Sequence, residues 1–79
     1  MKILYFARLR EAFGESEEIA LDHEIRVSEI VARLRKRGDQ WEEELSRPFR
    51  VAINLKLAGQ DAIVRDGDEL AIFPPVTGG

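Results

Sequence analysis

The chain has 79 residues, which is the length of one small domain. It contains no cysteine and a single histidine, His23, so disulfides, thiolate metal sites and a cysteine nucleophile are excluded and no metal site is predicted. The net charge of −3 argues against nucleic acid as a partner, and the lack of a signal peptide or a span-length apolar stretch predicts a cytoplasmic protein without a membrane partner.

The first third of the chain has the pattern of two strands joined by a helical turn. Residues 2–7, KILYFA, are apolar on both alternating faces, which predicts a central strand covered at least in part on both sides. Residues 8–14, RLREAFG, predict a turn of helix closed by Gly14. Residues 15–21, ESEEIAL, predict a second strand, and the two strands would pair as an antiparallel hairpin with a wide connection.

The strongest helix signal covers residues 27–37, VSEIVARLRKR. Its apolar side chains recur at helical spacing and form one stripe, made by Val27, Ile30, Val31 and Leu34. Gly38 suits a left-handed position just past the helix end. Residues 39–45, DQWEEEL, predict a further short helical turn in which Trp41 and Leu45 pack together.

The last third of the chain alternates like strand. Residues 50–58, RVAINLKLA, predict one strand or two short strands hinged at Asn54. Residues 65–69, RDGDE, predict a turn with Gly67 at positive φ. Residues 69–73, ELAIF, predict the final strand, with alternate side chains facing inward. A helix between strands covers one face of such a mixed sheet, so the fold class is α+β.

The chain ends FPPVTGG, residues 73–79, without a charged side chain. Pro74 and Pro75 fix φ and favour an extended backbone that projects from the last strand. Gly78 and Gly79 carry no side chain and fit a slot too narrow for other residues. Such a tail can place a carboxylate in a partner's active site. A carboxylate needs activation, and no phosphate-cradling glycine loop is present, so the nucleotide site is predicted on a partner.

The sequence resembles the small, sulfur-carrying subunits of molybdopterin synthases. Three segments carry the resemblance: DGDELAIFPPVTGG at residues 66–79, FARLRE at residues 6–11 and VAIN at residues 51–54. The resemblance implies a ubiquitin-like β-grasp domain over residues 1–73, with one main crossover helix, and an extended tail over residues 74–79. That family often has a capping Thr or Ser where this chain has Arg26, and Ser28 is the alternative cap.

The resemblance also implies a reaction cycle with three partners. An adenylyltransferase related to ubiquitin-activating enzymes uses ATP and Mg to adenylate the carboxylate of Gly79, and a sulfurtransferase system turns it into a thiocarboxylate. The tail then enters the large synthase subunit, which carries the catalytic site, and gives its sulfur to cyclic pyranopterin monophosphate. Two carriers are spent for each dithiolene, and a four-chain complex is implied. The chain itself binds no cofactor and is not an enzyme on its own.

Family roles transfer to eight residues. Gly79 is the site of adenylation and thiocarboxylation. The residues implied in tail insertion are Gly78, Thr77, Val76, Pro75 and Pro74. Phe73 is expected to dock on the partner, because its strand parity puts it outside the core, with core packing as the alternative. Arg10 is expected to pair with an acidic group of the partner, with a solvated surface arginine as the alternative.

Three other functions remain open from the sequence. A sulfur carrier for thiazole synthesis would share the fold, the Gly-Gly end and the adenylation step. A ubiquitin-like modifier would share the activation chemistry but form isopeptide bonds with lysines. A pure interaction domain would have an inert tail, and deleting Gly78 and Gly79 would leave its function intact.

Overall fold

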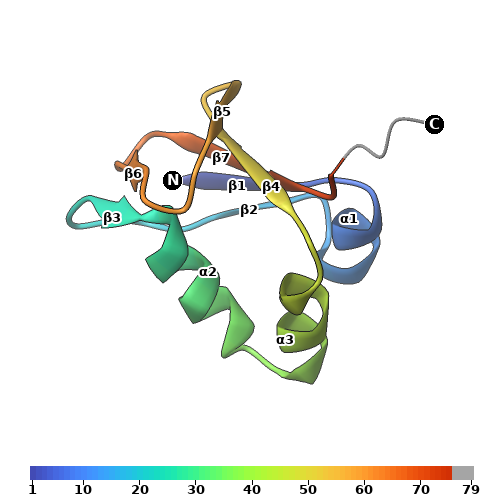
Figure 1. Cartoon of the computed structure of the whole chain (residues 1–79). Helices are drawn as coiled ribbons and strands as arrows, with labels where there is room; N and C mark the ends of the chain where they lie inside the picture. Colours follow the sequence, from blue (N-terminus) through green and yellow to red (C-terminus); the bar gives the residue numbers. More distant parts are fainter. Residues whose placement is uncertain (76–79) are drawn as a thin grey trace.

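A five-stranded mixed sheet forms the body of the protein, and helices pack against one of its faces (Figure 1). The computed structural model describes residues 1–75. In spatial order the strands are β2 (Ser16–Glu18), β1 (Lys2–Tyr5), β7 (Glu69–Phe73), β4 (Arg50–Ile53) and β5 (Lys56–Ala58). The helices are α1 (Arg8–Phe13), α2 (Val27–Arg35) and α3 (Asp39–Ser46), and a second, two-stranded sheet joins β3 (Ile25–Arg26) to β6 (Ile63–Val64).

The first and last strands lie side by side in the middle of the sheet. β1 and β7 are parallel, with Ile3 opposite Leu70 and Tyr5 opposite Ile72. The outer pairs, β1 with β2 and β4 with β7, are antiparallel. Parallel neighbours need a crossover, which here includes α2. This arrangement is the ubiquitin-like β-grasp fold, and it confirms the predicted α+β class with a mixed sheet.

One apolar core lies between the sheet and the helices. Within residues 1–75, the buried side chains are Met1, Ile3, Tyr5, Leu9, Ile25, Val27, Ile30, Val31, Leu34, Leu45, Val51, Val64, Leu70 and Ile72. The predicted stripe of α2 is therefore entirely in the core. Leu70 and Ile72 are fully buried, whereas Glu69, Ala71 and Phe73 are half-buried. The predicted parity of the last strand is confirmed.

Two details of the main helix differ from the prediction. α2 ends at Arg35, and the amide of Arg37 donates to the carbonyl of Leu34 at 3.1 Å in a tightened last turn. Gly38 is extended (φ 159°, ψ 176°) instead of left-handed, and it is the residue before α3. The prediction carried the helix through Arg37 and made Gly38 its cap, whereas α2 ends two residues earlier and Gly38 is the N-cap of α3.

The first turn of α2 is capped by a neighbouring segment and not by a side chain. Arg26 is the N-cap residue, and no side chain there, Ser28 included, makes a capping hydrogen bond. The amides of Val27 and Ser28 donate to the carbonyls of Ala62 and Gln60, both at 3.0 Å. Backbone carbonyls thus satisfy amides that a helix otherwise leaves unpaired. This pairing explains why an arginine is tolerated where a Ser or Thr cap was expected.

The short turn expected at residues 39–45 is a full helix of eight residues, α3. Its Trp41 stacks on Phe13 of α1, with ring centroids 3.7 Å apart and the planes parallel, and meets the edge of Tyr5 at 6.0 Å. The guanidinium of Arg37 lies 4.8 Å from the Trp41 ring centroid. Trp41 therefore finds its aromatic partners on other elements, which local spacing does not reveal.

Residues 50–58 form the two-strand alternative that the sequence left open. β4 and β5 are joined by a hairpin turn in which Asn54 and Leu55 both have positive φ, 49° and 71°. Asn54 tolerates this conformation, as expected. The turn reverses the chain, so the side chains beyond it do not continue the inward parity of Val51. Leu55 and Leu57 are consequently exposed, at 90% and 66%.

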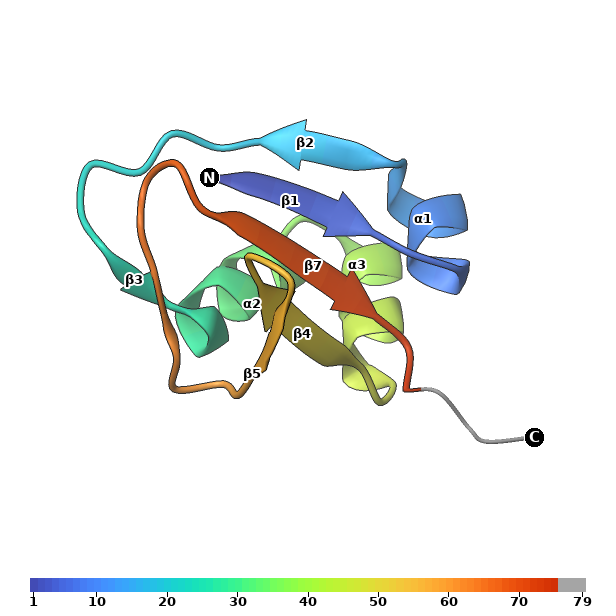
Figure 2. The ribbon, with the colours of Figure 1, turned by 90° about the horizontal axis from the view of Figure 1, so that it is seen from above.

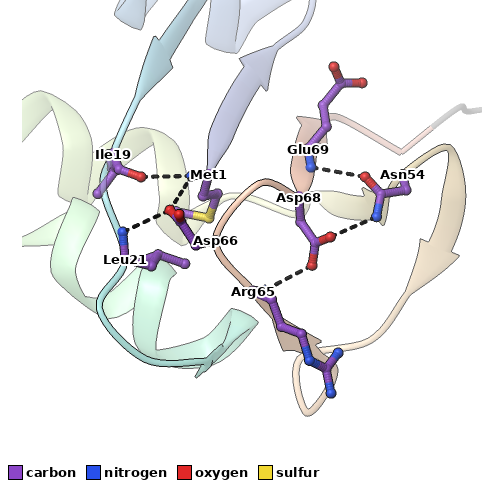
Figure 3. Close-up of polar contacts among 8 residues, drawn as sticks. All are labelled: Met1, Ile19, Leu21, Asn54, Arg65, Asp66, Asp68 and Glu69. Atoms are coloured by element: carbon purple, nitrogen blue, oxygen red, sulfur yellow. Dashed lines mark hydrogen bonds and ion pairs between the residues drawn. The ribbon is translucent and has the colours of Figure 1, made fainter.

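The acidic turn before the last strand fixes the strand in place (Figure 3). A carboxylate oxygen of Asp68 accepts the backbone amide of Arg65 at 2.8 Å, and the other accepts the side-chain amide of Asn54 at 3.0 Å. The Asn54 side-chain oxygen accepts the backbone amide of Glu69 at 3.0 Å. The β4–β5 turn and the start of β7 are therefore joined by side-chain hydrogen bonds across the end of the sheet.

Asp66 makes a second connection, to the first residues of the chain (Figure 3). Its Oδ1 accepts the backbone amide of Leu21 at 3.2 Å and lies 3.5 Å from the α-ammonium of Met1. That ammonium also donates to the carbonyl of Ile19 at 2.8 Å. The motif at residues 66–69, part of the segment that carried the family resemblance, thus has a structural role of its own.

Hydrogen bonds lower the pKa of both aspartates below the ordinary value of 3.8. For Asp66 the main cause is the backbone amide of Leu21, followed by the Met1 ammonium, and for Asp68 it is the backbone amide of Arg65, followed by Asn54. A carboxyl group with a lowered folded pKa stabilises the fold above its unfolded pKa. That contribution is lost as the pH falls through the folded pKa.

Acid should therefore unfold the protein partly through these two groups. We expect the urea concentration at the unfolding midpoint of the wild type to decrease as the pH is lowered from about 5 to about 3. The Asp66→Asn, Asp68→Asn double variant should show a smaller decrease over the same range. Urea titrations across this range test it, with exposed Glu43→Gln as the matched control. Parallel curves for the double variant and the wild type would contradict the assignment.

Candidate functional site at the root of the C-terminal tail

The helices leave one face of the sheet uncovered, and we call it the open face (Figure 2). The strand register places Leu4, Ala71, Ala52 and Leu57 in one row across β1, β7, β4 and β5. Paired residues in a sheet point to the same side, and this side is opposite to the buried Ile3, Leu70 and Val51. The middle of the open face is therefore apolar without being part of the core.

The apolar row leads to the point where the chain leaves β7. Phe73 is opposite Arg50 in the register, and both residues line a hollow of about 260 Å³ together with Leu57 and Pro75. We call this the root hollow. Phe6 follows the open-face parity at the end of β1 and is 43% exposed, and its amide donates to the carbonyl of Ile72 at 3.2 Å.

This combination has the features of a protein docking surface. Apolar side chains on a soluble domain lose contact with water only when a partner covers them, and each Å² removed contributes about 25 cal/mol. An apolar patch beside the root of the tail differs from the scattered exposed apolar residues of an ordinary surface. A partner that grips the open face would also hold the start of the tail.

The predicted tail residues fall into two groups. Phe73 is half-buried and faces the open side, in agreement with its outward placement by parity, while Pro74 is half-buried and Pro75 is exposed. The predicted insertion residues Val76, Thr77 and Gly78, and the predicted reactive residue Gly79, lie outside the described residues. The structure thus describes the root of the tail and the surface around it.

Arg10 is not part of the root hollow. It lies on α1, at the end of the sheet where β1 and β7 finish, and its side chain is exposed (Figure 1). Its guanidinium is 3.6 Å from a carboxylate oxygen of Glu15, a contact between two exposed groups. Such pairs contribute little, so Arg10 can exchange this partner for another. Its predicted role with an acidic partner group stays a prediction.

Sequence reasoning missed Arg50, Leu57 and Phe6 as members of this site. In a single uninterrupted strand Leu57 would share the face of the buried Val51, and only the hairpin at Asn54 moves it to the open face. Arg50 lies opposite Phe73 because β4 and β7 pair antiparallel, and β7 begins 16 positions after the end of β4. Phe6 carried the one available signal, because its strand was apolar on both faces.

A groove larger than the root hollow lies on the helical side and has other properties. It holds about 530 Å³ and is lined in part by Val31, Phe49, Arg35 and Glu42. Two hydrogen bonds of 2.8 and 2.6 Å join the Arg35 guanidinium to the Glu42 carboxylate. Arg35 and Glu42 thus satisfy each other, and the groove shares no lining residue with the root hollow, so we do not assign it the function.

Residues 1–75 hold neither a cluster of metal ligands nor a membrane-spanning helix. No group of three or more His, Cys, Asp or Glu side chains in this part of the chain is placed to hold a metal ion. No helix there is long and apolar enough to cross a membrane. The tail and the open face therefore remain the candidate site.

The family model of the ThiS family matches residues 3–79, which is nearly the whole chain. The chain belongs to the ThiS family. Among curated proteins, this ThiS-family chain is 40% identical over 81 aligned positions to the molybdopterin synthase sulfur carrier subunit of Haemophilus influenzae, covering 100% of this chain and 99% of the relative. The subunit of the same name from Escherichia coli is 37% identical with the same coverage.

A solved structure shows that the ThiS-family fold is shared with a second kind of protein. The small archaeal modifier protein 1 of Haloferax volcanii is 29% identical, with a TM-score of 0.68, and the match covers 95% of each chain. The β-grasp body is thus common to proteins named as sulfur carriers and to one named as a modifier. The fold alone does not separate the two functions.

Proposed function

We propose that this chain is the sulfur carrier subunit of molybdopterin synthase, and that the carboxylate of Gly79 carries the sulfur. The observation that carries the proposal is the full-length similarity to two subunits of that name, at 40% and 37% identity. The apolar open face at the root of the tail supports it, because a carrier must be held while its tip reacts elsewhere.

The chemistry begins with activation of a poor acyl donor. The Gly79 carboxylate attacks the α-phosphate of ATP, held with Mg by an adenylyltransferase partner, and pyrophosphate leaves. Hydrosulfide supplied by a sulfurtransferase system then attacks the acyl carbon, AMP leaves with the electron pair of the broken C–O bond, and the S–H proton is released. The product is a thiocarboxylate, which is an anion near neutral pH and a good nucleophile.

The second half of the cycle takes place on the large synthase subunit. The tail enters that subunit, and the thiocarboxylate sulfur displaces an oxygen substituent from a carbon of cyclic pyranopterin monophosphate. A C–S bond forms, and the oxygen leaves with the electron pair of the broken C–O bond. Water then cleaves the bond between the sulfur and the acyl carbon, and Gly79 returns to a carboxylate. A dithiolene contains two sulfurs, so two carriers react for each product. The chain supplies sulfur, and the large subunit supplies the catalytic site.

The described residues fit a subunit that brings no catalytic groups of its own. The root hollow contains one cation, Arg50, and otherwise Leu57, Phe73 and Pro75. None of the three apolar residues can act as a general acid or base. A surface of this kind contributes binding and positioning, which are the two requirements of a carrier docked on an enzyme.

A second candidate function is that of a ubiquitin-like modifier. The specific observation in its favour is the 29% identity to the small archaeal modifier protein 1 of Haloferax volcanii over 95% of each chain. Activation at Gly79 would be the same, and the acyl carbon would then be attacked by a lysine amine in place of sulfur. Tryptic peptides in which residues 66–79 of this chain are joined to a lysine through the carbonyl of Gly79 would support this candidate, since Arg65 is the last trypsin site of the chain.

Intact mass spectrometry of the native-ended protein tests the proposal. We expect incubation with ATP, Mg, the cognate adenylyltransferase and a sulfur source to replace one oxygen of Gly79 by sulfur. Addition of the large subunit and cyclic pyranopterin monophosphate should then return Gly79 to a carboxylate and produce molybdopterin. Without ATP the mass should not change.

The outcomes separate the candidates. An unchanged Gly79 with partners shown to be active on another carrier would contradict the sulfur-carrier function. A thiocarboxylate that forms but is not consumed by the large subunit and the pterin precursor would point to another sulfur acceptor, such as a thiazole precursor. Isopeptide adducts without any thiocarboxylate would favour the modifier.

A further inference from the structure

We propose that Arg50 recognises a carboxylate of the large subunit that receives the tail, so that this partner presents an acidic side chain beside the apolar residues that cover the root hollow. The inference rests on the proposed function and adds to it the chemistry of the partner surface. It assigns to Arg50 the role of a specificity residue for docking, separate from the reaction at Gly79.

Arg50 lies where docking and tail entry meet. It is the first residue of β4 and pairs in register with Phe73, the last residue of β7. Its exposed side chain lines the same hollow as Leu57, Phe73 and Pro75. A partner surface that covers the ring of Phe73 and follows the chain past Pro75 therefore covers the Arg50 guanidinium too.

Arg50 differs in its ionic contacts from the arginines on the neighbouring helix α1. The guanidinium of Arg8 lies 2.7 Å from a carboxylate oxygen of Glu44, and that of Arg10 lies 3.6 Å from one of Glu15. Within residues 1–75, no carboxylate is in ion-pair contact with Arg50, and no side-chain hydrogen bond of the guanidinium is found. Its charge is therefore available to an outside group.

Docking makes an unpaired guanidinium expensive. Burial of a charge without a partner costs several kcal/mol, and removing water from the hollow to cover its apolar side chains removes the water around Arg50. A carboxylate on the partner offsets this cost, because the planar guanidinium can donate two parallel hydrogen bonds to it. Surfaces without such a group would be rejected, which makes Arg50 a determinant of partner choice.

The experiment measures binding of the full-length, native-ended protein to the cognate large subunit by titration calorimetry. We expect Arg50→Glu to raise the dissociation constant by about tenfold or more. Arg50→Lys should raise it less, since an ammonium keeps the charge but not the paired hydrogen bonds. Arg33→Glu is the matched control, because it makes the same charge change at an exposed position of α2 that does not line the root hollow. Unfolding midpoints of all variants verify that they are folded.

Salt provides an independent readout. A charge pair at a partly exposed interface weakens as ionic strength rises, so the affinity of the wild type should fall with salt more steeply than that of Arg50→Gln. Equal slopes for the two proteins would overturn the proposal. The neutral Arg50→Gln variant also avoids any repulsion that the glutamate introduces. It should bind the large subunit more weakly than the wild type, as Arg50→Glu does.

Other outcomes are equally decisive. If Arg50→Glu binds like the wild type while Phe73→Ala binds more weakly, docking on the open face stands and the role of Arg50 falls. If Arg50→Glu instead slows formation of the Gly79 thiocarboxylate and leaves large-subunit binding unchanged, Arg50 acts during activation, and the proposal is wrong. If the wild type neither binds the large subunit nor gains sulfur, the proposed function itself fails.

Discussion

Deleting Gly78 and Gly79 is expected to abolish sulfur transfer completely while leaving the stability of the domain unchanged. The proposed chemistry occurs at the terminal carboxylate, and a chain ending at Thr77 would present a branched residue two positions short of the reactive position. The core that the structure describes lies between Met1 and Ile72, so the truncation removes none of it. The loss should appear in mass spectrometry as a terminal residue that never gains sulfur.

A one-residue extension provides the sharper control. Adding a residue after Gly79 keeps every native side chain and moves only the carboxylate, and we expect the same complete loss of sulfur transfer. The urea midpoints of wild type, truncated and extended proteins should agree within the error of the measurement. Retained activity in either variant would mean that the reactive group is elsewhere in the chain.

The sequence predicted individual helices and strands better than it predicted which strands pair with each other. The apolar stripe of α2 and the parity of β7 depend on local spacing, and both predictions are confirmed. β3 and β6 were not predicted, because each has only two residues and gains its pairing from a segment 37 or more residues away. Local pattern carries little information about pairings formed over such separations.

Backbone contacts between distant segments account for the remaining differences. The first turn of α2 is capped by the carbonyls of Gln60 and Ala62, so the residues around Arg26 give no signal from which this cap could be predicted. The partners of Trp41 are Phe13 and Tyr5, which lie on α1 and β1. Both arrangements join segments that are far apart in the sequence. Patterns within a short stretch of sequence carry no information about such contacts.

The C-terminal signature combines two roles that the sequence presents as one motif. Asp66 and Asp68 hold the start of β7 through hydrogen bonds to backbone amides and to Asn54. β7 ends at Phe73, and the proposed chemistry belongs to the terminal carboxylate of Gly79. The acidic half therefore sets the register of β7, and that register determines on which face Phe73 and the root of the tail emerge.

The open face was the part of the site least accessible from sequence. Its apolar row draws single residues from four strands, and Leu57 joins it only because the turn at Asn54 and Leu55 reverses the chain. Within each strand, Leu4, Ala52 and Ala71 are ordinary alternating positions. Their shared surface exists only through the register, which is why the prediction reached Phe73 and stopped there.

Two adjacent residues of β7 should respond to alanine in opposite ways. Ile72 is fully buried, and Ile72→Ala is expected to cost about 2–5 kcal/mol of stability through lost burial and a cavity. Phe73 is half-buried on the open face, and Phe73→Ala should cost about 1 kcal/mol of stability or less. Affinity for the large subunit should fall about tenfold to a hundredfold for Phe73→Ala, since aromatic residues are frequent anchors of interfaces.

The comparison requires binding per folded molecule. Urea titrations give the free energy of unfolding of each variant, and calorimetry with the large subunit, at a temperature where both variants are folded, gives the dissociation constant. We expect Ile72→Ala to bind close to wild type once corrected for its unfolded fraction. A Phe73→Ala variant that unfolds but binds normally when folded would place the ring in the core and remove the open face from the docking surface.

The neighbouring positions make this a test of register as well as of docking. A shift of one residue between β7 and its partners would exchange the faces of Ile72 and Phe73 and thus exchange the two phenotypes. The hydrogen bonds of Asp68 and Asn54 at the start of β7 prevent such a shift in the folded protein. At neutral pH the Asp68 carboxylate is ionised, and its hydrogen bonds keep Phe73 on the open face. Below the pKa of Asp68 the carboxyl group is protonated and this contribution is lost.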